Sequence, residues 1–311
     1  MKNLLTPKLD YVFKMLFTKD TELLVDLINS VLDLSGDKRI CSIKVLNPGI
    51  LPETIKSKFI ILDIRATDEA GRQYDIEVQV KKYDSWPKRV LYYISRMYGN
   101  QLKSGDEYEK LNPVIGIYFQ DYKQFPKYKD KFHFCFELRD EECPELRLTD
   151  DMSLHIFELP KFDQLEEKQP ADNNLNEWLH FFNHAHEEKE ESMRTHYTNP
   201  KIGKAFNILE NLSSDTEVWI QALEREKALK DEISMLASAR REGEKNGFVK
   251  GVVKGEKAGF VKGEKTGFVK GERLGIEKTA KNLFLLGTLS IEEISRATGL
   301  SIAEIKAFKS E

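Results

Sequence analysis

Apolar side chains at the start of the chain recur at steps of three and four residues, which is the spacing of an amphipathic helix. Pro7, a residue suited to the first helical turn, precedes four apolar positions between residues 12 and 17. A second stripe of the same kind runs through residues 23–32, and Gly36 follows as a stop signal. The pattern therefore predicts two helices at the beginning of the chain.

The pattern then changes to alternation in two stretches, residues 58–67 (KFIILDIRAT) and 73–82 (QYDIEVQVKK). Their even-numbered positions are mainly apolar, so each stretch predicts a β-strand with one apolar and one polar face. The short connection between them predicts an antiparallel hairpin. A turn centred near Ala70 places Asp63 directly opposite Glu77 on the polar face.

Helical spacing returns over residues 86–104 and is followed by three apolar runs of strand length. These runs are 113–119, 132–138 and 154–159. From about residue 174 the strand signal stops, and helices are predicted at 175–189, 200–212 and 215–241. This order predicts an α/β fold, in which a mixed sheet flanked by helices is followed by a helical C-terminal region.

Nine glycines, from Gly243 to Gly275, then follow one another at an unbroken period of four. Glycine inside a helix costs ~1 kcal/mol relative to alanine, so this tract is predicted to be either flexible or held by packing. Small residues at this spacing allow two helices to approach closely, which favours self-association into a homo-oligomer. A solvated, positively charged spacer explains the same pattern equally well, and the sequence leaves both open.

The last residues predict a small helical pair, because Ser290 with Glu293 and Ser301 with Glu304 have the spacing of capping boxes. The spacing of the pair is similar to that of a helix-turn-helix, which reads DNA. Its acidic residues are unsuited to a phosphate-facing surface, so a small packing or dimerising module explains the pair at least as well. The pattern thus divides the chain into four predicted segments: an α/β domain at 1–170, a helical region at 171–241, a basic glycine repeat at 242–278 and a helical module at 279–311.

Composition adds limits on the class of protein. The 311 residues carry a net charge of −4, but 12 basic and 6 acidic residues give 240–281 a charge of +6, which leaves −10 on the rest. Such a basic segment is compatible with a polyanionic partner. No run approaches the ~18 apolar residues of a membrane span, so no membrane partner is expected. Three cysteines without a signal peptide favour a reducing, cytoplasmic location.

The polar face of the predicted hairpin offers the strongest candidate chemistry. Directly opposed residues have Cβ atoms ~4.5–5.5 Å apart, and like charges such as Asp63 and Glu77 repel one another there. A hard divalent ion such as Mg²⁺ relieves this repulsion, since it accepts one or two carboxylates and completes its shell with water and phosphate oxygens. The alternative is an ordinary solvated polar face on which Arg65 and Lys81 act as counter-charges.

Three blocks of sequence carry a resemblance to a known family. They are Asp10-x-x-Phe13-Lys14-x-x-Phe17, LDIRATDEAGRQYDIEVQ at 62–79 and RVLYYISRMYGNQLKSGDEYEKLNPVIGI at 89–117. Together they resemble the Rpn family of recombination-promoting nucleases, also described as transposases, in the PD-(D/E)XK nuclease superfamily. Asp63 followed by Glu77-x-Gln79 is similar to the metal-binding signature of that superfamily. The resemblance is strong over residues 4–160 and looser in the tail.

The resemblance implies a restriction-endonuclease-like sheet and Mg²⁺-dependent hydrolysis of DNA, with double-stranded DNA as the expected substrate. It implies that Asp63 and Glu77 bind the metal and that Gln79 stands where the superfamily usually has lysine. This departure matters because glutamine only hydrogen-bonds, whereas lysine carries a charge. Lys81 or Lys82 is then the candidate for the missing charge.

Four basic residues are predicted to contact DNA: Lys14, Lys81, Arg89 and Arg96. Arg89, Tyr93 and Arg96 are three or four residues apart, so they share a helix face that is suited to phosphates. Lys14 lies four residues after Asp10 and shares a helix face with it. This pair either borders the cleft or forms a surface ion pair, and the spacing alone favours the surface pair.

The expected function is therefore that of a metal-dependent DNA endonuclease, a hydrolase that promotes recombination or transposition. One alternative is a DNA-binding or self-assembling protein that keeps the nuclease fold but has lost efficient chemistry through Gln79. Another is a structural interaction protein organised by the glycine repeat.

Overall fold

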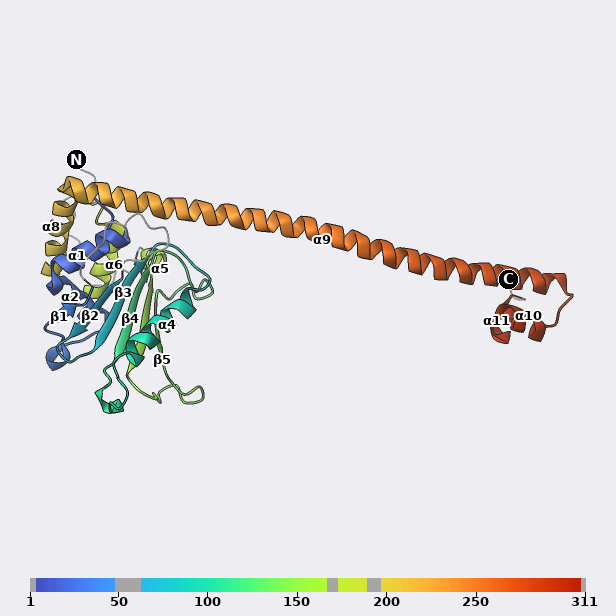
Figure 1. Cartoon of the computed structure of the whole chain (residues 1–311), viewed down its shortest axis with the longest axis horizontal. Helices are drawn as coiled ribbons and strands as arrows, with labels where there is room; N and C mark the ends of the chain where they lie inside the picture. Colours follow the sequence, from blue (N-terminus) through green and yellow to red (C-terminus); the bar gives the residue numbers. More distant parts are fainter. Residues whose placement is uncertain (1–3, 48–62, 167–172, 189–196, 309–311) are drawn as a thin grey trace. The chain divides into compact units, whose positions relative to one another are not determined.

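The structure is a computed structural model, and two compact units make up the chain (Figure 1). Met1–Met235 holds the sheet, and Leu236–Glu311 holds the glycine tract. The described residues are 4–47, 63–166, 173–188 and 197–308. Residues 58–62 of the first predicted hairpin strand lie outside these ranges.

A mixed six-stranded sheet forms the centre of the first unit, in the order β1-β2-β3-β4-β6-β5. β3, β4 and β6 run parallel, and the other neighbours pair antiparallel. The strands are β1 (Ile43–Val45), β2 (Ile64–Asp68), β3 (Gln73–Gln79), β4 (Val114–Gln120), β5 (His133–Glu137) and β6 (Met152–Glu158). The predicted mixed α/β sheet is confirmed, whereas β1 is too short to show a detectable alternation.

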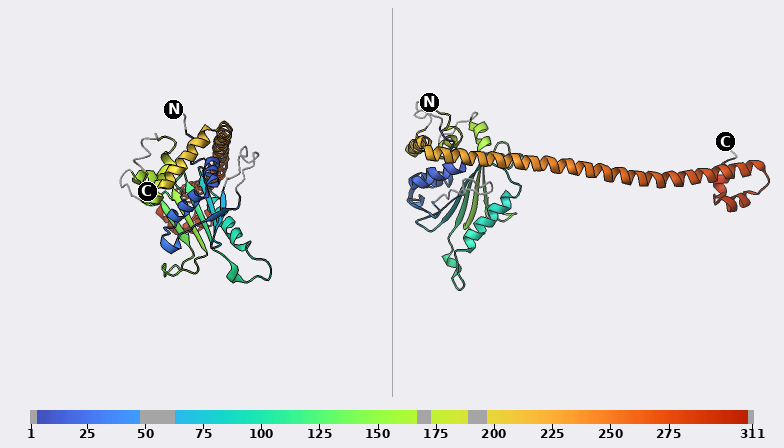
Figure 2. Two further views of the ribbon diagram at one scale, coloured as in Figure 1. Left: turned by 90° about the vertical axis from the view of Figure 1, so that its left-hand side faces the viewer. Right: turned by 45° about the horizontal axis from the view of Figure 1, so that its top comes forward.

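Helices cover both faces of this sheet (Figure 2). The main core lies on one face, where aromatic residues such as Phe13, Phe119 and Phe182 contact one another. The helices on that side are α1 (Asp10–Lys19), α2 (Thr21–Val31), α5 (Leu159–Glu166), α6 (Asn174–His184) and α8 (Pro200–Ser214). A smaller core on the other face lies beneath α4 (Trp86–Gly99).

The helix predicted over 86–104 ends five residues early. The backbone N–H of Asn100 closes α4 by bonding to the carbonyl of Arg96. The side chain of Gln101 then exchanges two hydrogen bonds of 2.8 and 2.9 Å with the backbone of Asn112, which holds the chain in a loop. This loop contains the short 3₁₀ turn η2 (Tyr108–Lys110), and a similar turn, η1 (Gly36–Lys38), follows α2.

The glycine tract is helical. α9 (Thr216–Leu286) is a single helix of 71 residues that begins in the first unit and contains all nine glycines of the repeat. A Cβ added at any of these glycines would meet no atom within 4 Å, so the described residues do not hold the tract by packing. No described helix is long and apolar enough to cross a membrane.

The predicted helical pair at the C-terminus is confirmed as α10 (Ile291–Thr298) and α11 (Ile302–Ala307). Both predicted capping boxes are present, and Gly299 ends α10 in a left-handed conformation with φ of +76°. Ala280, Ile294 and Ile305 are fully buried between these helices and the end of α9. The second unit thus has a small core of its own.

Candidate active site

The hairpin formed by β2 and β3 has the predicted register. Arg65 pairs with Asp75, so Asp63, two residues earlier in the chain, lies at the level of Glu77. Gly71 turns the chain with φ of +84°, a left-handed conformation that glycine adopts without strain. The tight turn therefore brings the two predicted acidic residues to the same place on the sheet.

The polar face of β3 is buried, because α4 packs on this side of the sheet. Asp75, Glu77 and Gln79 are only 5–6% exposed. Trp86 of α4 packs edge-on against Tyr118 of β4, with the ring centroids 5.4 Å apart, and Tyr118 is the register partner of Glu77. The alternative of an ordinary solvated polar face is therefore wrong for β3.

Three acidic side chains share this buried face, and we call Asp63, Asp75 and Glu77 the carboxyl cluster. The pKa of Asp75 is raised to about 6, first by burial and then by the charge of Asp63. The Tyr118 hydroxyl donates a 2.8 Å hydrogen bond to Oδ2 of Asp75 and offsets part of this effect. Asp63 is half-buried, and Arg65 Nε lies 2.9 Å from its Oδ2.

Glu77 is the next member of the cluster. Its pKa is raised to about 8, mainly by burial; the charge of Arg89 lowers it in part, and the charges of Asp75 and Asp63 add to the rise. Arg89 Nη2 lies 3.3 Å from Oε1 of Glu77 and donates a 3.0 Å hydrogen bond to Oε1 of Gln79. Near neutral pH the Glu77 carboxyl therefore keeps a proton that an exposed glutamate would have lost.

The residues present fit a divalent cation by the chemistry of their donor set. Within the described ranges, no three His, Cys, Asp or Glu side chains are arranged to hold a metal by themselves. However, Asp63 and Glu77 supply the two carboxylates that Mg²⁺ commonly takes, with water and phosphate oxygens as its remaining ligands. Such an ion would counter the repulsion and burial that now oppose ionisation of the carboxyl cluster.

The first helix also contributes to this region. Asp10 and Lys14 are both only 4% exposed, so the predicted surface ion pair is wrong. The pKa of Lys14 is lowered by burial and raised in part by the nearby charge of Asp63. Asp10 is held by Arg225 of α9, whose Nε lies 3.0 Å from both carboxylate oxygens. The face that these two residues share therefore borders the carboxyl cluster.

Lys81, the candidate for the missing positive charge, has a partner on α9. Its Nζ lies 2.9 Å from Oε1 of Glu232, and both side chains are largely buried. The Tyr83 hydroxyl donates a 2.6 Å hydrogen bond to the same Glu232 oxygen. Lys81 Nζ also lies over the Tyr83 ring, 4.8 Å from its centroid, and Arg89 lies 5.5 Å from the same centroid. Lys81 and Arg89, the arginine that contacts Glu77, therefore both contact the Tyr83 ring.

The four predicted DNA contacts differ in exposure. Arg96 is exposed on α4, and Arg89 is a quarter exposed beside the carboxyl cluster. Lys14 and Lys81 are largely buried. Only the two arginines therefore present charge at the surface in this conformation.

Sequence reasoning missed four residues of this region. They are Asp75, Tyr118, Arg225 and Glu232. Asp75 had a usable signal, because it lies on the same face of the predicted strand as Glu77. Tyr118 lies in an apolar run, so nothing in the sequence distinguishes it from an ordinary core residue. Arg225 and Glu232 lie in a highly charged helix, so nothing distinguishes them from solvated residues.

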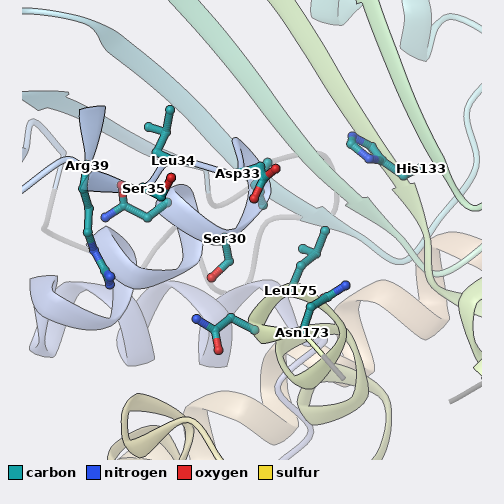
Figure 3. A pocket seen from close by; sticks show the side chains of 11 residues that line it. Ser30, Asp33, Leu34, Ser35, Arg39, His133, Asn173 and Leu175 are labelled. Atoms are coloured by element: carbon teal, nitrogen blue, oxygen red, sulfur yellow. The ribbon is translucent and has the colours of Figure 1, made fainter. Parts of the chain in front are cut away.

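A pocket of about 500 Å³ lies elsewhere in the first unit, between α2, β5 and the start of α6 (Figure 3). Asp33, Arg39 and His133 are among its lining residues. Arg39 pairs with Asp26 at 3.2 Å, and burial lowers the pKa of His133 to about 4. None of the predicted site residues lines this pocket.

Comparison with known protein families shows which family the chain matches. The family model described as a PD-(D/E)XK nuclease family transposase matches residues 7–239. The match includes the carboxyl cluster, α4 and the part of α9 that holds Arg225 and Glu232. No curated protein and no solved structure matches the chain.

Proposed function

The chain belongs to the PD-(D/E)XK nuclease family of transposases, and we propose that it is a Mg²⁺-dependent endonuclease that hydrolyses DNA phosphodiester bonds. The observation that carries the proposal is the buried carboxyl cluster. Its members Asp75 and Glu77 have raised pKa values because burial and mutual repulsion oppose their ionisation. A site that gathers negative charge in this way is suited to a divalent cation and to the phosphate that accompanies it.

In this proposal Asp63 and Glu77 hold the metal ion, which when bound lowers the pKa of a water molecule and neutralises charge on the phosphodiester. The Tyr118 hydroxyl holds the carboxylate of Asp75 in a fixed orientation. Arg89 stands beside Glu77 and supplies positive charge next to the reacting phosphate. Lys14 and Lys81 border the same region, and Arg96 on the exposed part of α4 contacts the DNA backbone.

Gln79 has a positioning role in the proposed reaction. Its Oε1 accepts from Arg89 at 3.0 Å, and its Nε2 donates to the backbone carbonyl of Lys81 at 3.0 Å. Both ends of the amide are thus occupied by the protein. Gln79 therefore orients the arginine that stands near the place of the usual lysine, and the arginine carries the charge that glutamine lacks.

We further propose that the activity serves recombination or transposition and that the protein assembles into a homo-oligomer through its second unit. The exposed, glycine-rich part of α9 supports this assembly, because helices approach closely where side chains are absent. We keep the proposed division of the chain into four segments: a nuclease-like domain at 1–170, a helical region at 171–241, the basic glycine repeat at 242–278 and the helical module at 279–311.

Cleavage of supercoiled plasmid with Mg²⁺ or with EDTA tests the proposal. We expect nicked and linear products with Mg²⁺ alone, and we expect Asp63→Asn and Glu77→Gln to abolish them while the fold is retained. Glu142→Gln, at an exposed position away from the cluster, is the matched control. Cleavage that survives both active-site changes would show that the reaction lies elsewhere.

A second candidate function is DNA binding without efficient cleavage. The observation that favours it is Gln79, because an amide with both ends bonded inside the protein cannot activate water. Plasmid binding without cleavage in any of Mg²⁺, Mn²⁺ or Co²⁺ would support this candidate. Cleavage restored by Gln79→Lys in that case would place the loss of chemistry at this residue.

A further inference from the structure

The outer face of α4 combines exposed aromatic rings with positive charge. Tyr92 and Tyr93 are 56% and 42% exposed, and their ring centroids lie 5.6 Å apart in an edge-to-face arrangement. The guanidinium of Arg96 lies over the Tyr92 ring, 5.8 Å from its centroid. Between Trp86 and Gly99 the helix carries three basic residues and no acidic one. Surface aromatics are usually scattered singly, so this arrangement calls for a partner.

The aromatic pair lies close to the carboxyl cluster along the helix. Arg89 reaches Glu77 and Gln79 from the first turns of α4. Tyr92 and Tyr93 are three and four residues further on, so they follow Arg89 by one helical turn, or ~5 Å along the axis. Arg96 follows by about two turns. We call Arg89, Tyr92, Tyr93 and Arg96 the α4 track.

We infer that the α4 track binds unpaired bases of DNA next to the bond that is cleaved, so that the substrate is a duplex with a single-stranded stretch or junction. The inference rests on the proposed function and names its substrate class more narrowly. Basic residues suffice to bind the phosphates of any DNA. Exposed tyrosine rings add affinity only where base faces are free to stack, and in an intact duplex those faces are covered by neighbouring bases.

The charge and spacing of the track support this occupant over a second protein chain. A polyanion complements a helix segment with three positive and no negative side chains. The arginines stand at both ends of the track, where they can contact phosphates on either side of the unpaired bases, and the tyrosine rings between them are exposed. Contacts from Arg96 to Tyr92 also keep that ring in place, because its Nη1 lies 3.4 Å from the hydroxyl.

Fluorescence anisotropy in EDTA tests the inference without any dependence on cleavage. Three labelled DNAs of the same sequence are compared: a single strand, a full duplex and a duplex with a central unpaired bubble. The variants are Tyr92→Ala, Tyr93→Ala and Tyr92→Phe. Tyr108→Ala in η2 is the control, because it removes an even more exposed tyrosine ring outside the track. Circular dichroism verifies that each variant is folded.

We expect the wild-type protein to bind the bubble and the single strand more tightly than the duplex. Each alanine variant should weaken binding to unpaired DNA about 5- to 150-fold, the range of stacking on one aromatic side chain, while duplex binding changes less than about twofold. Tyr108→Ala should bind like the wild type. Tyr92→Phe, which keeps the ring but loses the hydroxyl that contacts Arg96, should lose much less affinity than Tyr92→Ala. Arg96→Gln should weaken all three DNAs and reduce the dependence on salt.

Equal losses on duplex and unpaired DNA, or no loss at all, would overturn the inference. A change in sedimentation of the DNA-free protein in Tyr92→Ala, with unchanged DNA binding, would also overturn it and assign the face to a second copy of the chain. Failure of the wild type to cleave both plasmid and bubble DNA with Mg²⁺ would refute the proposed endonuclease activity, but it would leave this binding preference as a separate result.

Discussion

Replacement of Glu77 by glutamine removes a buried carboxyl group that has to keep its proton in the folded protein, and we expect it to stabilise the metal-free chain. Burial and the acidic neighbours raise the pKa of Glu77 from 4.5 to about 8. In the unfolded chain the same group titrates near its ordinary value. Glutamine has nearly the same shape, can still accept a hydrogen bond from Arg89, and has no proton to lose.

The magnitude follows from the difference between the two ionisation constants. Each tenfold difference is worth about 1.4 kcal/mol, so the cost of Glu77 to the folded state approaches roughly 5 kcal/mol above pH 8. At pH 7 the group is still mainly protonated in the folded state, and the cost is roughly 3 kcal/mol. Below pH 4.5 both states hold the proton and the cost vanishes.

The sign of the pH dependence is therefore fixed. Between pH 4.5 and 8 the unfolded chain binds fewer protons at this position than the folded chain, so the free energy of unfolding falls as the pH rises. Asp75, whose pKa is raised from 3.8 to about 6, acts in the same direction over a lower range. A carboxylate that is stabilised by a salt bridge would give the opposite slope.

Urea denaturation in EDTA at pH 5, 7 and 8.5 measures this effect. We expect Glu77→Gln to gain stability over the wild type as the pH rises, whereas Glu142→Gln, at an exposed position, differs from it by a constant amount. Mg²⁺ should stabilise the wild type more at pH 8.5 than at pH 5, because it binds the ionised carboxyl cluster. Parallel pH curves for the wild type and Glu77→Gln would refute this account of the cluster.

Three further predictions concern α9. In urea denaturation, Arg225→Met should lower the free energy of unfolding by about 3–5 kcal/mol, because it leaves Asp10 buried without its partner. Adding Asp10→Asn to the same chain should restore much of this loss. Glu232→Gln should speed labelling of Lys81 by an amine-reactive reagent, measured by mass spectrometry, because Nζ loses its counter-charge; an unchanged rate would mean that the ion pair does not restrain this lysine. At low protein concentration, Gly259→Ala should raise the free energy of unfolding of the helix by about 1 kcal/mol in circular dichroism, since the new Cβ meets no atom of the same chain within 4 Å. At high concentration it should lower the stability of the proposed homo-oligomer, because the added Cβ keeps the two helices apart; a gain at both concentrations would contradict assembly at this glycine.

The sequence predicted those parts of the site that depend on neighbouring residues. Alternation and a short turn set which residues of β2 and β3 face one another, and this local information is sufficient to bring Asp63 to the level of Glu77. The same alternation could not reveal that the polar face is buried. That outcome depends on α4, which connects two parallel strands and packs Trp86 against Tyr118 on the face that carries Glu77.

The contribution of α9 could not be read from the sequence, and the reason is physical. Arg225 and Glu232 lie 215 and 151 residues away from Asp10 and Lys81, and they are surrounded in the chain by other charged residues that remain in solvent. They are seven residues apart, so they share a helix face and enter the region of the carboxyl cluster together. Arg225 is the counter-charge of Asp10, and Glu232 is the counter-charge of Lys81. Buried charges need such partners, so the first part of α9 is required to complete the proposed active site. Accordingly, the compact unit that holds the sheet extends to Met235, and the family match continues to residue 239.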